Sequence, residues 1–326
     1  MTGADAVLRR VRTSPYPPEP PRRSRVVDVL MRSTAARRRR AGGTPHLSGA
    51  ADDTHYADDA KVAFEYDAAG VESLFDILAG HVSAEVVDDR DVLDLGCGWG
   101  GKTVRYAAET GLRSIVGLDL PGVFAPEVPE RFARRRGVGS CSFANGYAED
   151  VPAPDDTFDV VLCEDVLEHV RDPERVLLEC WRVLRPGGLL VARFPSIRML
   201  RAHHFDRALT FPGLHYLLPM RTWAAGFNHY LVEHPAEESY EPFNAVGPTR
   251  YHCGVTANLN GMDLATFRSL VAAGPFVVRT LRLVPFPAAK FGPHTGALRL
   301  YRMLRAVPAL REPLSRTIAF VGEKAP

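Results

Sequence analysis

Short apolar runs rich in β-branched residues alternate with amphipathic stretches along the chain from about residue 90 onward. The runs occupy residues 91–96, 114–120, 140–146, 158–165, 189–195, 276–286 and 316–324. Near-continuous apolar runs of this length are typical of strands that are buried on both faces of a parallel sheet. Seven such strands alternating with helices predict an α/β fold with a doubly wound, mostly parallel sheet.

Helix signals fall between these runs, and residues 172–188 carry the clearest set. Asp172 suits the N-cap and Pro173 suits the first helical position, because that position has no intrahelical partner for its N–H. Gly187 and Gly188 are expected to end this helix. Further helices are expected at residues 63–82, 101–111 (ending at Gly111) and 263–274.

The alternation predicts how the chain is divided. We expect a basic, disordered arm at 1–45, a helical cap at 46–90, the main core at 91–196, a lid at 197–256 and the rest of the core at 257–326. Residues 197–256 interrupt the pattern between the fifth and sixth strands, and they are rich in aromatic residues and His. Such a composition suits a lid over a planar or apolar small molecule.

Charge is unevenly distributed, although the formal net charge is only +1. Residues 1–43 carry eleven basic and three acidic residues, which leaves the body of the chain mildly acidic. An acidic body argues against a nucleic-acid partner. No apolar run approaches the roughly 20 residues of a membrane-spanning helix, so we expect a cytoplasmic protein with no membrane partner.

The cysteines are expected to be buried thiols in a reducing compartment, because their number is odd and no CxxC pair is present. They are Cys97, Cys141, Cys163, Cys180 and Cys253.

The turn after the first strand, in "LDLGCGWGG", has the character of a ligand-binding loop. Gly96, Gly98 and Gly100 let the backbone approach a ligand closely, and the following helix offers free N–H groups. Asp94 ends this strand, and Asp119 ends the next one, where it would accept from both ribose hydroxyls. The GCGWG spacing differs from the GxGxxG of nicotinamide and flavin sites. An acid beside the loop favours a nucleoside that carries an amino acid.

The chain resembles the class I S-adenosylmethionine (SAM)-dependent methyltransferases, in particular the methyltransferase type 11 family. The stretches that carry the resemblance are "VLDLGCGWGG", "VGLDL" and "AEDVPAPDDTFDVVLCEDVLEHVRDPERVLLECWRVLRPGGLL", within residues 88–195. The resemblance implies a Rossmann-like fold, SAM as the cofactor, and a SAM-binding core at 91–196.

The resemblance also implies roles for residues in the first half of this core. Asp94 and the backbone from Gly96 through Cys97 to Gly100 would meet the methionine end of SAM. Asp119 would hold the ribose. Glu164, at the end of the fourth strand, is counted with the cofactor-binding residues.

The adenine side departs from the family pattern. Leu120 would pack against the adenine, and the backbone N–H of Ala148 would contact it. Where the family often has an Asp that accepts from the adenine amino group, this chain has Tyr147. Tyr147 is therefore a cofactor-binding candidate without an assigned contact.

The stretch "CEDVLEHV" is the main candidate for chemistry. Asp165, Glu168 and His169 are spaced by three and four residues, which predicts that they share one face of a helix. The stretch is similar to the Glu-x-x-Glu-His of small-RNA 2′-O-methyltransferases, which bind a divalent ion; His203 or His204 would be the later ligand. Related "LEHV" stretches in metal-free family members brace the fold instead. We expect no metal, and we take Glu168, His169, His203 and His204 as the catalytic candidates.

Methyl transfer is an in-line displacement, for which positioning supplies much of the rate. A hydroxyl acceptor must also lose a proton, for which His is the usual base near neutral pH. We expect O-methylation of a small molecule in the biosynthesis of a specialised metabolite or sugar derivative. The alternatives are C- or N-methylation, metal-assisted RNA 2′-O-methylation, and a SAM-binding module without catalysis. A homodimer is compatible with the sequence.

Overall fold

The computed structural model describes residues 24–30, 32, 59–69, 74–77, 82–121, 124–200, 213, 216–218, 222–223, 260–291 and 295–326. The chain divides into two compact units, one comprising 1–55 with 197–260 and the other 56–196 with 261–326. Most of the predicted lid, with His203, His204 and Cys253, lies outside the described residues. The second unit carries the sheet and the glycine-rich turn.

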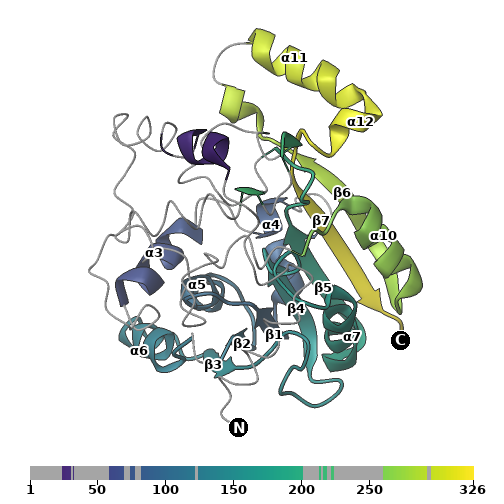
Figure 1. Ribbon diagram of the computed structural model, residues 1–326. Helices are drawn as coiled ribbons and strands as arrows, with labels where there is room; N and C mark the ends of the chain where they lie inside the picture. Colours follow the sequence, from purple (N-terminus) through teal and green to yellow (C-terminus); the bar gives the residue numbers. More distant parts are fainter. Residues whose placement is uncertain are drawn as a thin grey trace. The chain divides into compact units, whose positions relative to one another are not determined.

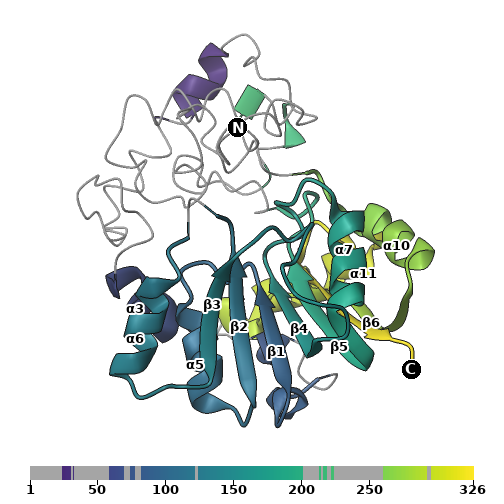
Figure 2. The same cartoon turned by 90° about the horizontal axis from the view of Figure 1, so that it is seen from below.

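A seven-stranded sheet with the order β3-β2-β1-β4-β5-β7-β6 forms the centre of this unit (Figures 1 and 2). The strands are β1 (Asp91–Leu95), β2 (Ser114–Asp119), β3 (Cys141–Asn145), β4 (Phe158–Glu164), β5 (Leu184–Phe194), β6 (Phe276–Pro285) and β7 (Ser315–Lys324). β1 to β5 pair in parallel, whereas β7 runs antiparallel to both β5 and β6. The predicted doubly wound, mostly parallel sheet is confirmed.

The strand order reverses at β1, which lies between β2 and β4. In open α/β sheets, ligands bind beyond the carboxyl ends of the strands at such a reversal. The register sets Asp94 of β1 opposite Gly117 of β2 and Leu162 of β4, so the ends of these three strands meet at one edge.

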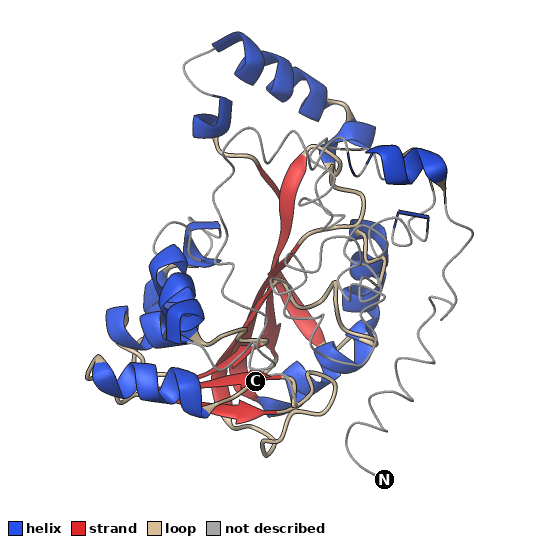
Figure 3. Cartoon of the chain, turned by 60° about the vertical axis from the view of Figure 1, so that its left-hand side comes forward, coloured by secondary structure: helices blue, strands red, loops and turns tan. Residues whose placement is uncertain are grey.

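Helices cover both faces of the sheet (Figure 3). The longer ones are α3 (Asp59–Ala69), α5 (Gly101–Glu109), α6 (Glu127–Arg135), α7 (Pro173–Val183), α10 (Leu264–Ala273) and α11 (Thr295–Ala306). The short ones are α4 (Leu74–Ile77), α12 (Pro308–Arg311), η1 (Ala84–Val87) and η6 (Ala288–Phe291). The helices predicted at 63–82, 101–111 and 263–274 correspond to α3 with α4, to α5 and to α10. The sequence pattern missed α6, α11 and α12.

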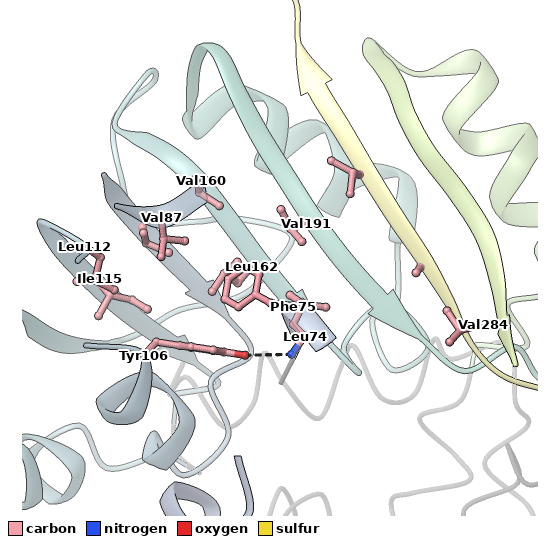
Figure 4. Packing of buried hydrophobic residues seen from close by; sticks show 13 residues of the cluster. Leu74, Phe75, Val87, Tyr106, Leu112, Ile115, Val160, Leu162, Val191 and Val284 are labelled. Carbon is pink, nitrogen blue, oxygen red and sulfur yellow. Dashed lines mark hydrogen bonds between the residues drawn. The ribbon is translucent and has the colours of Figure 1, made fainter. Parts of the chain in front are cut away.

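The core under α5 connects the apolar interior with the polar end of the sheet (Figure 4). Val92 and Leu162 lie on this face of the sheet, and α5 contributes Tyr106 to the same cluster. The Tyr106 ring meets Phe75 of α4 edge-on, with the ring centroids 5.6 Å apart. Its hydroxyl donates to Glu164 Oε1 at 2.6 Å, so one side chain spans from the core to the carboxyl ends of the strands.

The end of α7 differs from the prediction. The helix ends at Val183, and Gly187 and Gly188 belong to β5 instead of forming a helical stop. Pro186 is the physical reason, because its ring disfavours helical backbone at the residue before it and it has no N–H to donate. Lys324 of β7 donates to Leu184 O at 2.7 Å, which satisfies a carbonyl just beyond the helix.

The start of α7 agrees with the prediction and gives a stability test. Asp172 Oδ1 accepts from Arg175 N at 3.0 Å, as an N-cap does. We expect Asp172→Ala to lower the free energy of unfolding by about 0.5–2 kcal/mol in urea denaturation. Asp172→Asn is the matched control and should change little, because Asn caps equally well. Equal losses in both variants would contradict a capping role.

The cysteines in the described part of the chain are free thiols, as predicted, and all but the half-buried Cys141 are fully buried. Within the same described ranges, no helix combines the length and apolar character that crossing a bilayer requires.

Candidate active site

Residues 96–100, the glycine loop, join β1 to α5 through three residues with left-handed backbone. Gly96, Gly98 and Gly100 have φ values of 76°, 63° and 84°, which residues with a side chain rarely adopt. The loop is anchored to β2, because Gly96 N donates to Leu118 O at 2.8 Å. A Cβ atom at Gly96 would lie 2.2 Å from Cγ2 of Val166, so the segment after β4 lies directly against the loop. These glycines are required by both conformation and space.

Charged side chains gather on one face of the sheet beside this loop. Side chains alternate along a strand, so Asp94 shares a face with Val92, and Glu164 shares it with Leu162. Val92 and Leu162 belong to the core beneath α5, which places both carboxylates under that helix at the carboxyl ends of their strands. This face of the sheet is therefore apolar along β1 and β4 and acidic at the carboxyl ends of the two strands.

Asp119 braces the glycine loop from the end of β2. Its Oδ2 accepts from Gly98 N at 2.7 Å, and its Oδ1 accepts from Leu120 N at 2.7 Å. Burial raises the pKa of Asp119 to about 6, although both backbone N–H groups favour the charged form. Each carboxylate oxygen can accept a second hydrogen bond, so a ribose diol can still be bound.

Asp94 is almost fully buried, at 4% exposure, and Thr103 of α5 donates to its Oδ2 at 2.5 Å. Burial raises the pKa of Asp94 to about 7, and the nearby charge of Glu164 acts in the same direction. One carboxylate oxygen of Asp94 therefore already accepts a hydrogen bond from the first turn of α5.

Glu164 is the centre of a buried ionic network. Its Oε2 accepts from Arg193 Nε at 3.0 Å and lies 3.5 Å from Lys102 Nζ, and its Oε1 accepts from Tyr106. Burial alone would raise the pKa of Glu164, but Lys102 and Arg193 together hold that pKa below its ordinary value. Arg193 Nη2 also donates to Asp165 Oδ2 at 3.1 Å, which ties the network to the segment after β4.

The stretch "CEDVLEHV" does not form the predicted helix. β4 continues to Glu164, Asp165 has a left-handed φ of 55°, and a single turn follows. In that turn, Val166 O accepts from His169 N at 2.8 Å and from Val170 N at 3.2 Å. The three-and-four spacing was misleading because residues 166–170 form a single turn after the left-handed Asp165, so no helix is present to align the side chains.

Glu168 and His169 nevertheless form a close pair in this turn, residues 165–170. His169 Nε2 lies 3.7 Å from Glu168 Oε1. Glu168 is 3% exposed, and neither of its carboxylate oxygens accepts a hydrogen bond from the residues that the structure describes. Burial and the charge of Asp165 raise the pKa of Glu168 well above its ordinary value. A buried carboxyl group in this state has hydrogen-bonding capacity to offer a ligand.

The other catalytic candidates, His203 and His204, lie outside the described residues. Within the part of the chain that the structure describes, no group of three or more His, Cys, Asp or Glu side chains is arranged to hold a metal ion.

The predicted adenine side lies next to Asp119. Asp119 O accepts from Gly146 N at 2.9 Å, which brings the start of the 146–150 segment to the end of β2. Tyr147, the next residue, forms an isolated bridge with Asp150. Leu120 and Ala148 lie in the same region of chain, and the contacts of all three with adenine stay predictions.

Three charged side chains of the site were missed in the sequence. Lys102 directly follows the glycines, and Arg193 is a lone charge in the apolar run "LLVARFP", so both carried a readable signal. Glu65 of α3 accepts from Trp99 N and Gly101 N, both at 3.1 Å. It lies about 30 residues before the loop, and no motif marked it.

Comparison with known proteins agrees with this geometry. Residues 93–192 match the family described as a methyltransferase domain. A probable SAM-dependent methyltransferase of Mycolicibacterium smegmatis is 34% identical over 33% of this chain and 38% of its own length. The ubiquinone biosynthesis O-methyltransferase of Cereibacter sphaeroides is 40% identical over 31% and 39%. The norajmaline N-methyltransferase of Rauvolfia serpentina is 35% identical over 33% and 38%.

The matched region, the strand order and the glycine loop identify residues 93–192 as a domain of the class I SAM-dependent methyltransferase type. The chain spans about two fifths of the length of the relatives that it matches, so the likeness concerns this domain.

The side chains of the site fit SAM chemically. The donor carries an α-ammonium and a sulfonium, and the loop is surrounded by the carboxyl groups of Glu65, Asp94 and Asp119. Lys102 is the neighbouring cation, and its ammonium group already pairs with the carboxylate of Glu164. A surplus of acid around glycines that lack side chains suits a positively charged ligand close to the backbone.

Proposed function

We propose that the chain catalyses SAM-dependent methyl transfer to a small-molecule acceptor, with oxygen as the acceptor atom. The observation that carries the proposal is the Glu168–His169 pair, in a turn whose Val166 contacts the glycine loop. An imidazole beside a buried carboxyl group can take the proton that an acceptor hydroxyl loses during methylation. An acceptor that needs no deprotonation would not require this pair as a base.

Bound SAM supplies an electrophilic methyl group. In this proposal, Gly96, Cys97 and Gly98 line the methionine end, and Asp119 accepts from the ribose hydroxyls. The Glu164 network has a structural role at the base of the site, because the Glu164 carboxylate already pairs with Arg193 and Lys102. Leu120, Tyr147 and Ala148 are the proposed adenine contacts.

The relatives support methyl transfer but do not choose the acceptor atom, because one is named as an O-methyltransferase and another as an N-methyltransferase. The proton-accepting pair is what favours oxygen. A role in the biosynthesis of a specialised metabolite or sugar derivative, and a cytoplasmic location, remain predictions.

Calorimetry with SAM and S-adenosylhomocysteine, followed by turnover assays against panels of hydroxyl and amine acceptors, tests the proposal. We expect binding of both nucleosides and transfer to a hydroxyl acceptor. Binding without transfer to any acceptor would favour the non-catalytic SAM-binding module. Loss of transfer on addition of a chelator would favour the metal-assisted alternative, and absence of binding would refute the proposal.

Asp119 offers a direct test of the cofactor site. We expect Asp119→Ala to weaken SAM binding by about 1–3 kcal/mol, roughly 5- to 150-fold, because hydrogen bonds from the ribose to a carboxylate are lost. Isothermal titration calorimetry measures the change. The control is Asp155→Ala, which removes an exposed carboxylate that pairs with Arg182 away from the loop. Unchanged SAM affinity in Asp119→Ala would refute the ribose-binding role.

A further inference from the structure

Helix α3 contributes a carboxylate to the glycine loop from outside the matched methyltransferase domain. Glu65 Oε2 accepts from Trp99 N and from Gly101 N, both at 3.1 Å. The other oxygen, Oε1, lies 2.6 Å from the point where a Cβ atom of Gly98 would be. One carboxylate oxygen therefore holds the loop, while the second lies close to Gly98, which has no side chain.

The position of Glu65 is fixed by contacts elsewhere on α3. Val62 is fully buried in a cluster with Val104 of α5 and Phe132 of α6. The backbone of α3 also touches the first residue of α5, since a Cβ atom at Gly101 would lie 2.2 Å from Val62 O. At the start of the helix, Asp59 forms ion pairs with arginines of α6. The helix is thus docked on α5 and α6 independently of any ligand.

Lys102 is the cation that acts on Glu65 among the residues that the structure describes. However, Lys102 lies 3.5 Å from Glu164 and is held in that network. Asp94 and its charge lie close by, and burial raises the pKa of Glu65 to about 7. Because one oxygen of Asp94 is taken by Thr103, Glu65 Oε1 is the carboxylate oxygen best placed over the loop for a ligand cation.

We propose that Glu65 Oε1 accepts a hydrogen bond from the α-ammonium group of the methionine end of SAM, while Oε2 keeps its two bonds to the loop. Helix α3 then contributes to the cofactor site from outside the methyltransferase domain at 93–192. This inference rests on the proposed function, because it concerns how the same cofactor is recognised.

Binding of two ligands to the full chain tests the inference. The ligands are S-adenosylhomocysteine and its analogue in which the α-ammonium is replaced by hydrogen. The variant is Glu65→Gln, whose amide oxygen can still accept from the two loop N–H groups. We expect Glu65→Gln to weaken S-adenosylhomocysteine binding by about 10- to 100-fold, as for loss of a charge-assisted hydrogen bond. The affinity for the deaminated analogue should change by less than about 2-fold.

The control variant is Asp59→Asn, which loosens α3 at the end away from the loop. It should affect both ligands equally, if at all, and thermal unfolding of each variant confirms that it is folded. An equal loss for both ligands in Glu65→Gln, or no loss for either, would overturn the inference alone. Failure of the unmodified chain to bind S-adenosylhomocysteine would overturn the proposed function and the inference with it.

Discussion

Arg193→Met is expected to lower the free energy of unfolding by about 3–5 kcal/mol at pH 7, because it removes the closer of the two cations that pair with a buried carboxylate. Arg193 lies 9% exposed in β5, and its guanidinium bridges Glu164 and Asp165. After the substitution, Glu164 keeps Lys102 at 3.5 Å and the Tyr106 hydroxyl as its partners among the described residues. Urea denaturation at pH 7, followed by intrinsic fluorescence, measures the loss.

The pH dependence of this loss is set by the sign of the pKa shift. In the native chain the pKa of Glu164 is held below its ordinary value. The charged network therefore contributes stability above the pKa of the unfolded state, and this stability is lost as the pH falls through the folded value. In Arg193→Met, protonation of Glu164 relieves the penalty. The difference between the two proteins should be largest near pH 7 and shrink toward about pH 4.

Two further variants separate the network from general damage to the strand. Arg193→Met combined with Glu164→Gln should recover part of the stability, since no buried charge is left unpaired. Arg185→Met, in the same strand, removes a more exposed arginine that pairs with Asp91 and Asp159, and should cost less than about 1 kcal/mol. A loss that is the same at both pH values and is not recovered in the double variant would contradict the network.

The strands were predictable because each is a short apolar run between turn signals, and a parallel sheet buries both faces of such a run. Helix α6 was missed because its sequence lacks a clear helix signal. Its sequence, "EVPERFARR", is amphipathic, but it is only nine residues long and has Pro129 near its start and many charges, which are also typical of a loop. Only the packing of residues such as Phe132 against α3 and β3 makes the helix clear.

The cofactor loop was predictable from local sequence, whereas the side chains that surround it were predictable only in part. Asp94 and Asp119 lie at strand ends beside a recognisable glycine pattern. Glu65 reaches the same loop from a helix about 30 residues earlier, and only tertiary packing brings it there. The prediction at 165–170 was wrong because the spacing of Asp165, Glu168 and His169 was interpreted as helical, whereas the left-handed backbone of Asp165 leads into a single turn.

His169→Gln is expected to lower kcat by about 100-fold or more while SAM affinity stays unchanged, if His169 is the base that deprotonates the acceptor. Gln is close to His in size and can still hydrogen-bond, but it cannot take a proton. The turn that carries His169 contacts the glycine loop through Val166, so loss of the imidazole acts next to the site of transfer. Steady-state assays with a hydroxyl acceptor and calorimetry with SAM measure the two quantities.

The pH profile distinguishes a base from a merely structural His169. With an imidazole base, kcat/KM of the unmodified protein should rise between about pH 5 and pH 8 as the imidazole loses its proton, and this rise should disappear in His169→Gln. Arg171→Ala, an exposed change two residues further on, should leave both the rate and the profile intact. If His169→Gln kept full kcat, a group other than His169 would take the proton from the acceptor hydroxyl. If His169→Gln methylated an amine acceptor at the native rate, the result would instead support N-methylation, because a neutral amine attacks without a base.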